Sequence, residues 1–187
     1  MINFDLKTLK DRIIRAGKLD VKFYEEISTD DTALGQSLVI IAGSSLAAGI
    51  GGIGKFGWSS ILFGTFINLA SWFLWVYIIY ILGTKVARWS GSRVSFLQLL
   101  STLGFSASPG LLRILGLVPF TTDVIFVISA IWMLIAVVVA ARLALDYRRM
   151  RQAVIICVGS WIIQLLIILI LFSLFLKIFG VLDRSLS

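Results

Sequence analysis

The chain has 187 residues, of which 59% are hydrophobic and only 14% are charged, and its mean hydropathy is +1.00. A typical soluble domain is about half apolar and about a quarter charged, so this composition excludes a single soluble core and predicts an integral membrane protein. The net charge is +7. The bases cluster between apolar blocks and do not form a solvated face with interleaved aromatics, which argues against nucleic-acid binding.

Two residue types that commonly carry chemistry are scarce in this sequence. It contains no histidine, the commonest general base and a frequent metal ligand. Its single cysteine, Cys157, lies inside an apolar run, where the thiol stays protonated and inert. We therefore expect no enzyme active site, no metal site and no cofactor.

Residues 1–32 are predicted to form a cytoplasmic, amphipathic N-terminal segment that lies on the surface. Apolar residues at 2, 6, 9 and 13 share one helical face, and bases lie mostly away from it. Such a helix either lies in the headgroup layer or packs on the protein's own loops, and the sequence favours neither alternative. The bases that are candidates for contact with anionic lipid are Lys7, Lys10, Arg12 and Arg15.

Residues 33–179 are predicted to form an all-α transmembrane domain, with a short tail at 180–187. Five apolar blocks lie at about 34–54, 61–82, 94–120, 124–141 and 153–175. The first block is rich in small residues, which let helices approach closely in lipid. The third block is weakened by Gln98, Pro109 and Arg113, and Pro109 is expected to kink it or divide it into two half-segments.

The distribution of bases favours five crossings with a cytoplasmic N-terminus. That arrangement places 13 bases on the cytoplasmic side and 3 on the opposite side. If the third block stayed on one side, the basic stretch at 142–152 would face outward. A re-entrant hairpin at Pro109 is the alternative, because broken helices are tolerated where protein surrounds them.

Four polar residues fall within the apolar blocks, and they are candidates for intramembrane function: Asn68, Gln98, Arg113 and Gln164. Asn68 is expected to form a hydrogen bond between helices rather than to bind a substrate. Arg113 is expected to extend toward the outer headgroups rather than to fill a buried functional role.

Several short motifs, in this order along the chain, resemble the Yip domain family of five-pass membrane proteins. The motifs are Phe23-Tyr24-Glu25-Glu26-Ile27, Arg88-Trp89-Ser90-Gly91, the stretch from Leu103 to Pro109, and Ala141-Arg142-Leu143-Ala144-Leu145-Asp146. The resemblance covers about 23–175 and implies a multi-pass membrane fold without an established reaction. Arg88, Trp89 and Arg142 are candidate lipid or partner contacts, because an indole anchors at the interface and a guanidinium meets lipid phosphate.

The Golgi members of that family carry an Asp-Leu-Tyr-Gly-Pro type motif, which this sequence lacks. The difference argues against binding of Rab-type small GTPases and favours a prokaryotic member, located in the plasma membrane. The sequence thus predicts a non-enzymatic organiser that binds anionic lipid, other membrane proteins or itself. The alternatives are a small transporter or channel, whose path the four intramembrane polar residues would line, and an accessory subunit of a larger membrane complex.

Overall fold

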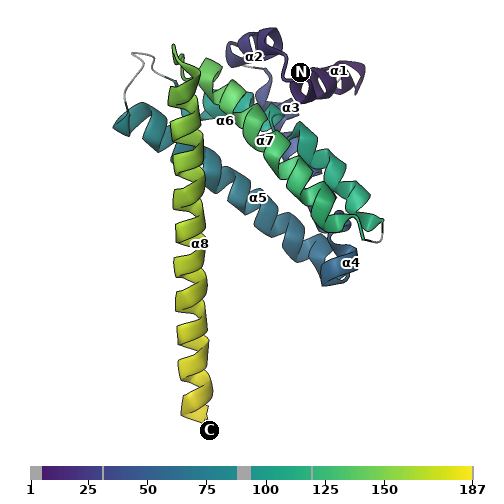
Figure 1. Cartoon of the computed structure of the whole chain (residues 1–187), viewed down its shortest axis with the longest axis vertical. Coiled ribbons are helices and arrows are strands. Elements are labelled where there is room, and N and C mark those ends of the chain that lie inside the picture. The colour runs from purple at the N-terminus through teal and green to yellow at the C-terminus, as the bar shows by residue number, and fades with distance from the viewer. Residues whose placement is uncertain (1–5, 31, 88–93, 119, 187) are drawn as a thin grey trace.

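The computed structural model describes residues 6–30, 32–87, 94–118 and 120–186, and these residues form helices and no strand (Figure 1). The predicted all-α class is confirmed. The helices are α1 (Leu6–Gly17), α2 (Val21–Ser28), α3 (Leu34–Gly51), α4 (Ile53–Phe56), α5 (Ser59–Tyr80), the π-helix η1 (Ile81–Val86), α6 (Phe96–Phe105), the 3-10 helix η2 (Ser108–Leu117), α7 (Thr122–Ala144) and α8 (Met150–Leu186).

Four helices in the described ranges are long and apolar enough to cross a membrane, not the five that the sequence predicted. They cover Leu34–Gly51, Ser59–Val86, Thr122–Ala144 and Met150–Ile178. The third apolar block does not qualify, because it is split into α6 and η2, each of ten residues. Proline lacks the backbone N–H that continues a helix, and Pro109 stands in the first turn of η2. The predicted division at Pro109 is confirmed.

The divided segment runs alongside α3 and does not double back as a hairpin. Gly104 lies against Ser37, Gly110 against Ser44, and Gly116 against Gly51. The contacts thus advance together along both segments. From residue 37 to residue 51 an α-helix rises about 21 Å, so α6 and η2 together accompany nearly the whole length of α3.

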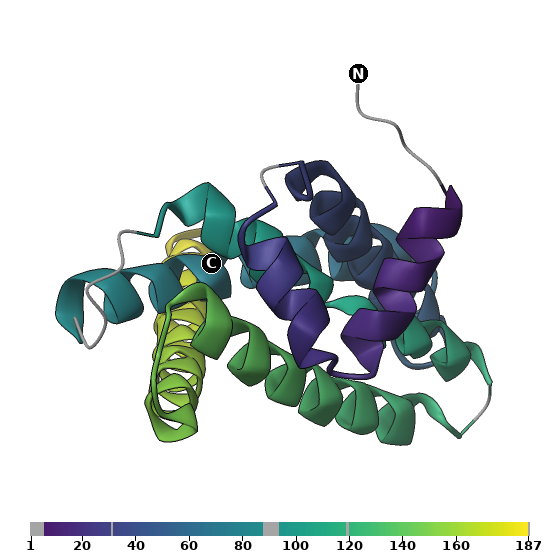
Figure 2. The same ribbon diagram turned by 90° about the horizontal axis from the view of Figure 1, so that it is seen from above.

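The two N-terminal helices lie across one end of the bundle (Figure 2). Asp20 begins α2 by accepting a hydrogen bond from the backbone N–H of Phe23, at 3.3 Å. Phe23 and Tyr24 are fully buried, and the ring of Phe23 packs edge-on against Phe105 of α6. The aromatic side chains of this segment therefore complete the core, which the sequence analysis did not predict.

Helix α1 packs on the protein itself, which decides between the two alternatives left open for its apolar face. Leu9 and Ala16 are buried, and Ile13 packs against the same core. Helix α7 also contacts α1, because the indole N–H of Trp132 donates a hydrogen bond to the backbone oxygen of Gly17 at 2.9 Å.

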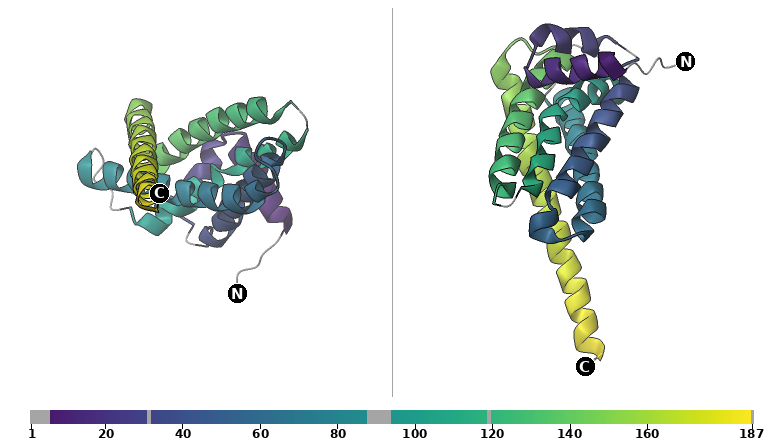
Figure 3. Two further views of the ribbon diagram at one scale, coloured as in Figure 1. Left: turned by 90° about the horizontal axis from the view of Figure 1, so that it is seen from below. Right: turned by 90° about the vertical axis from the view of Figure 1, so that its right-hand side faces the viewer.

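The two ends of the bundle are held by different contacts. Near the N-terminal helices, the hydroxyl of Tyr147 donates to the backbone oxygen of Gly83 at 3.1 Å and joins the end of α7 to η1. At the opposite end, Lys55 forms an ion pair with Asp123 at 2.6 Å. Helix α8 begins at the first end and extends past the other helices (Figure 3).

Candidate functional site

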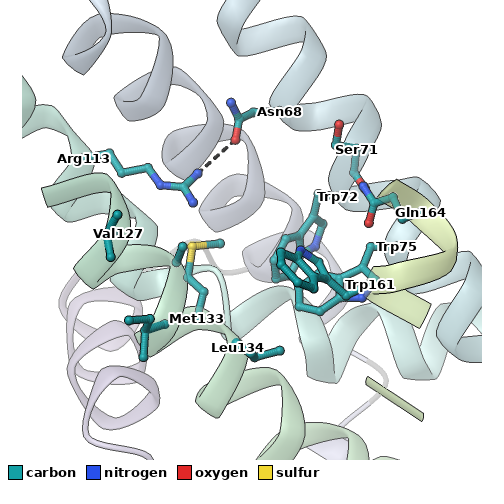
Figure 4. A pocket seen from close by; sticks show the side chains of 12 residues that line it. Asn68, Ser71, Trp72, Trp75, Arg113, Val127, Met133, Leu134, Trp161 and Gln164 are labelled. Atoms are coloured by element: carbon teal, nitrogen blue, oxygen red, sulfur yellow. Dashed lines mark hydrogen bonds between the residues drawn. The ribbon is translucent and has the colours of Figure 1, made fainter. Parts of the chain in front are cut away.

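A pocket of about 390 Å³ lies between α5, α7 and α8, with η2 at one end (Figure 4). Helices α5 and α7 both pack on α8, and the space between them is left open. The pocket is lined by Asn68, Ser71, Trp72, Trp75, Arg113, Val127, Ala130, Ile131, Met133, Leu134, Trp161 and Gln164.

One end of the pocket is polar and carries a positive charge. Arg113 Nη1 donates to Oδ1 of Asn68 at 2.9 Å, and its guanidinium lies 5.5 Å from the ring centre of Phe126. In the part of the chain that the structure describes, no carboxylate forms an ion pair with Arg113. The expected extension toward the headgroups is wrong, because this side chain folds back to an amide within the bundle.

The other end is aromatic. Trp72 and Trp75 meet edge to face, with ring centres 5.6 Å apart. The indole of Trp75 donates to Oγ of Ser160 at 3.0 Å, which ties α5 to α8. Figure 4 shows Trp161 beside this pair. Trp72 and Trp75 of α5 and Trp161 of α8 line this end of the pocket.

The structure brings together three of the four predicted intramembrane polar residues. Asn68, Arg113 and Gln164 all line the pocket, and Gln164 also donates to the backbone oxygen of Ser71 at 2.9 Å. Gln98 lies elsewhere, at the start of α6, and donates to the backbone oxygen of Ser28 at 2.7 Å. Its role is to hold the N-terminal helices, so it is not a pocket residue.

Sequence reasoning missed the aromatic part of the site. Trp72 and Trp75 are three residues apart and therefore share a helical face. This spacing could have indicated an aromatic surface on that helix. Nothing in the sequence indicates that Trp161 lies beside them, because that contact depends on how α8 packs against α5.

A second group of candidates, the bases, lies at the end of the bundle that holds α1 and α2. Arg148, Arg149 and Arg151 line a shallow hollow of about 340 Å³ together with Gln152 and Ile155. All three arginines are exposed. Arg142 is half-buried in the last turn of α7, and its Nε has no hydrogen-bond partner.

The four predicted lipid-contacting bases of the N-terminal segment fall into two kinds. Lys7 and Lys10 are exposed on α1. Arg12 and Arg15 are half-buried and form ion pairs within the segment, with Asp30 at 3.1 Å, Asp20 at 2.8 Å and Glu26 at 2.9 Å. The predicted contacts Arg88 and Trp89 lie outside the described residues.

The ion pairs of Arg15 affect the titration of their acidic partners. Hydrogen bonds from its guanidinium favour the ionised carboxylates, so the pKa values of both Asp20 and Glu26 lie below their ordinary values. These contacts fix α1 against α2, and they hold the guanidinium of Arg15 against acids of the same segment.

Among the described residues, no group of three or more His, Cys, Asp or Glu side chains gathers to hold a metal. The polar groups that line the pocket are a guanidinium, two amides, a hydroxyl and indole N–H groups. Such groups bind and orient oxygen-bearing ligands, and they include neither a carboxylate nor a thiol.

Comparison with known proteins identifies a family for this chain but no individual relative. No curated protein and no solved structure matches the chain. The model of the Yip1 domain family matches residues 20–172, which contain every long apolar helix in whole or in large part, and agrees with the range of the resemblance noted in the sequence. This family is not known for enzymes. The chain is therefore an integral membrane protein that belongs to the Yip1 domain family.

Proposed function

We propose that this protein is a non-enzymatic membrane organiser that crosses the bilayer five times and gathers anionic lipid at a basic cytoplasmic face. The observation that carries the proposal is the placement of the exposed bases. Lys7 and Lys10 of α1 lie at the same end of the bundle as the arginines around 148–151. The opposite end holds Lys55, which is paired with Asp123.

The fifth crossing in this proposal is made by α6 and η2 together. Although neither is long enough alone, their contacts advance from Ser37 to Gly51 along α3. Backbone groups of a broken helix tolerate membrane depth when protein surrounds them, and residues 101–110 are all buried. Five crossings then place the bases of α1 and the arginines around 148–151 on the cytoplasmic side, as the positive-inside rule requires.

Labelling with a membrane-impermeant maleimide tests this topology. Lys55→Cys and Arg148→Cys are introduced separately after the native thiol is removed by Cys157→Ala. We expect Lys55→Cys to react in intact cells and Arg148→Cys to react only after permeabilisation. Labelling of both positions in intact cells would overturn the five-crossing arrangement.

Lipid selection tests the role of the basic face. The full chain is reconstituted in nanodiscs that contain phosphatidylcholine and phosphatidylglycerol, and the retained lipid is measured by mass spectrometry. Arg148→Gln, Arg149→Gln and Arg151→Gln together should reduce the enrichment of phosphatidylglycerol, since each exposed base contributes about 1 kcal/mol near an anionic surface. Arg15→Gln, which removes a base already paired with acids, is the matched control and should have a smaller effect.

The proposed partners are other membrane proteins or a second copy of this chain. Helix α8 supports this part of the proposal, because residues 165–178 are apolar apart from Ser173 and Lys177, and nearly all of them are exposed along the helix. Cysteines placed at Leu169 or Leu166 would form cross-links in native membranes if α8 meets a second copy. Their failure to do so would leave another membrane protein as the partner.

The pocket favours one alternative, a small transporter for anions, because it holds a positive charge among apolar walls. Uptake of chloride or phosphate into proteoliposomes measures this activity. Flux that Arg113→Gln abolishes would replace the organiser as the proposed function.

The absence of the Golgi motif supports a prokaryotic origin and a location in the plasma membrane. It also argues against a small GTPase as the partner. Fractionation of the source cell checks the location.

A further inference from the structure

We infer that the pocket between α5, α7 and α8 binds an amphiphile whose head group carries a net negative charge on phosphate or carboxylate oxygens, which enters sideways from the bilayer and is held by Arg113. This inference rests on the membrane location of these helices and does not depend on the basic face proposed above.

The first support is the charge of Arg113. A guanidinium within a bundle of membrane helices is costly unless it is paired or reaches water. Its partner here, Asn68, is a neutral amide that accepts through Oδ1, while Nδ2 of the same amide donates to the backbone oxygen of Gly64 at 3.2 Å. A guanidinium has five N–H donors. The amide therefore satisfies part of its hydrogen-bonding capacity and none of its charge.

The second support is a further unpartnered donor among the residues that line the pocket, at its aromatic end. Nε1 of Trp72 is buried and has no hydrogen-bond partner, and the same is true of Nε of Arg113. Buried polar groups without partners are rare in native structures, and each calls for an explanation. Unpartnered donors on residues that line one pocket match a ligand that carries oxygen acceptors and a negative charge.

The third support is the shape and lining of the pocket. Its volume of about 390 Å³ lies within the range of small-ligand sites. Apart from Asn68, Ser71, Arg113 and Gln164, the walls are formed by tryptophan, methionine and aliphatic side chains. Val127 and Ile131 of α7 are each 57% exposed at its edge. Because they belong to a membrane helix, this edge faces the acyl chains of the bilayer.

These features favour an amphiphile over a free inorganic anion. An inorganic anion would lose its hydration among apolar walls and gain one guanidinium. An amphiphile brings its own apolar chain, which can lie along Val127 and Ile131 while the head group meets Arg113. The chain continues out of the pocket, so its length is not limited by the enclosed volume.

Native mass spectrometry of the delipidated full chain in an uncharged detergent tests this inference. The probes are phosphatidylglycerol, oleate, phosphatidylcholine and inorganic phosphate, each titrated separately. We expect one molecule of phosphatidylglycerol or oleate to bind at least about tenfold more tightly than phosphatidylcholine, the size of one hydrogen bond to a charged group. The two anionic probes distinguish a phosphate from a carboxylate head group.

Variants locate the binding. Arg113→Gln should lose the preference for the anionic probe by about tenfold or more, whereas Arg113→Lys should keep part of it. Ala130→Phe fills the pocket from α7 without changing any charge, and it should lower the affinity for both anionic probes. Arg149→Gln, on the basic face, should leave the affinity unchanged.

Four results would overturn the inference. The first is equal affinity for phosphatidylglycerol and phosphatidylcholine. The second is an anionic preference that survives in Ala130→Phe, which decides the matter even if Arg113→Gln does not fold. The third is inorganic phosphate that binds as tightly as the lipid, which would indicate a small-anion site. Loss of binding in Arg149→Gln alone would assign the lipid to the basic face and refute the pocket site.

Discussion

The two sides of this helix bundle differ in how closely their helices approach. On the side of α3, α6 and η2, small residues bring the backbones together, and Gly51 touches the carbonyl group of Arg113. On the side of α5, α7 and α8, α5 and α7 pack on α8 and leave a pocket that Trp72, Trp75 and Trp161 line. Without a hydrophobic force between helices in lipid, packing depends on side-chain size. The small-residue side therefore closes, and the aromatic side stays open.

The largest effect is expected where an aromatic side chain closes the packed side. Phe23→Ala should lower the free energy of unfolding by about 3–5 kcal/mol, because it removes a ring that is 1% exposed between Tyr24 and Phe105. Thermal unfolding in detergent measures this. Phe63→Ala, at a position that is 64% exposed, is the matched control and should change little. Equal effects at the two positions would show that α2 is not part of the core.

The next effect concerns the contact between α3 and η2. Gly51→Ala adds a Cβ that overlaps the backbone carbonyl of Arg113, and such overpacking costs about 1–3 kcal/mol. Gly159→Ala in α8 adds the same group where no other atom lies within 4 Å. It should leave stability unchanged or raise it slightly, since alanine favours a helix. If Gly51→Ala were equally harmless, the close contact of the two segments would be refuted.

On the open side, the indole of Trp75 joins α5 to α8 through a hydrogen bond. Trp75→Phe keeps most of the ring but removes the donor to Ser160, and we expect a loss of about 1 kcal/mol. A double-mutant cycle with Ser160→Ala isolates the pair, because the second substitution should add little once the first is made. Trp58→Phe, at a position that is 78% exposed, is the control. Additive losses would show that the two side chains do not interact.

The smallest effect concerns pH and the N-terminal helices that cover the packed side. Because Arg15 lowers the pKa values of Asp20 and Glu26 in the folded protein, these acids bind protons more readily when α1 is undocked. Their stabilising contribution is present above the ordinary pKa values of 3.8 and 4.5, and it is lost as the pH falls through the lower folded values.

Hydrogen exchange of α1 measures this dependence. Protection of the α1 backbone should decrease as the pH is lowered below about 4.5, after correction for the intrinsic exchange rate. Arg15→Gln should have weaker protection at neutral pH and a flatter pH profile. An unchanged profile in this variant would mean that its ion pairs do not hold α1.

The family membership and the membrane location followed from features that are local in sequence. Apolar runs long enough to cross a bilayer are visible in composition alone, and the division at Pro109 follows from the missing N–H of proline. The amphipathic face of α1 could also be predicted from the spacing of its apolar residues, because a helix repeats its side-chain directions every three or four residues. These inferences need no knowledge of which helices are neighbours.

The contacts that define the site required the tertiary structure. Arg113 and Asn68 are 45 residues apart, and Trp75 and Ser160 are 85 apart, so no periodicity relates them. The sequence assigned Phe23 and Tyr24 to a surface segment and grouped Gln98 with the other intramembrane polar residues, since hydropathy reports whether a side chain avoids water and not which helix covers it. Composition therefore determined that this chain enters the membrane, and only the packing of its helices decided where a charge and a cavity meet.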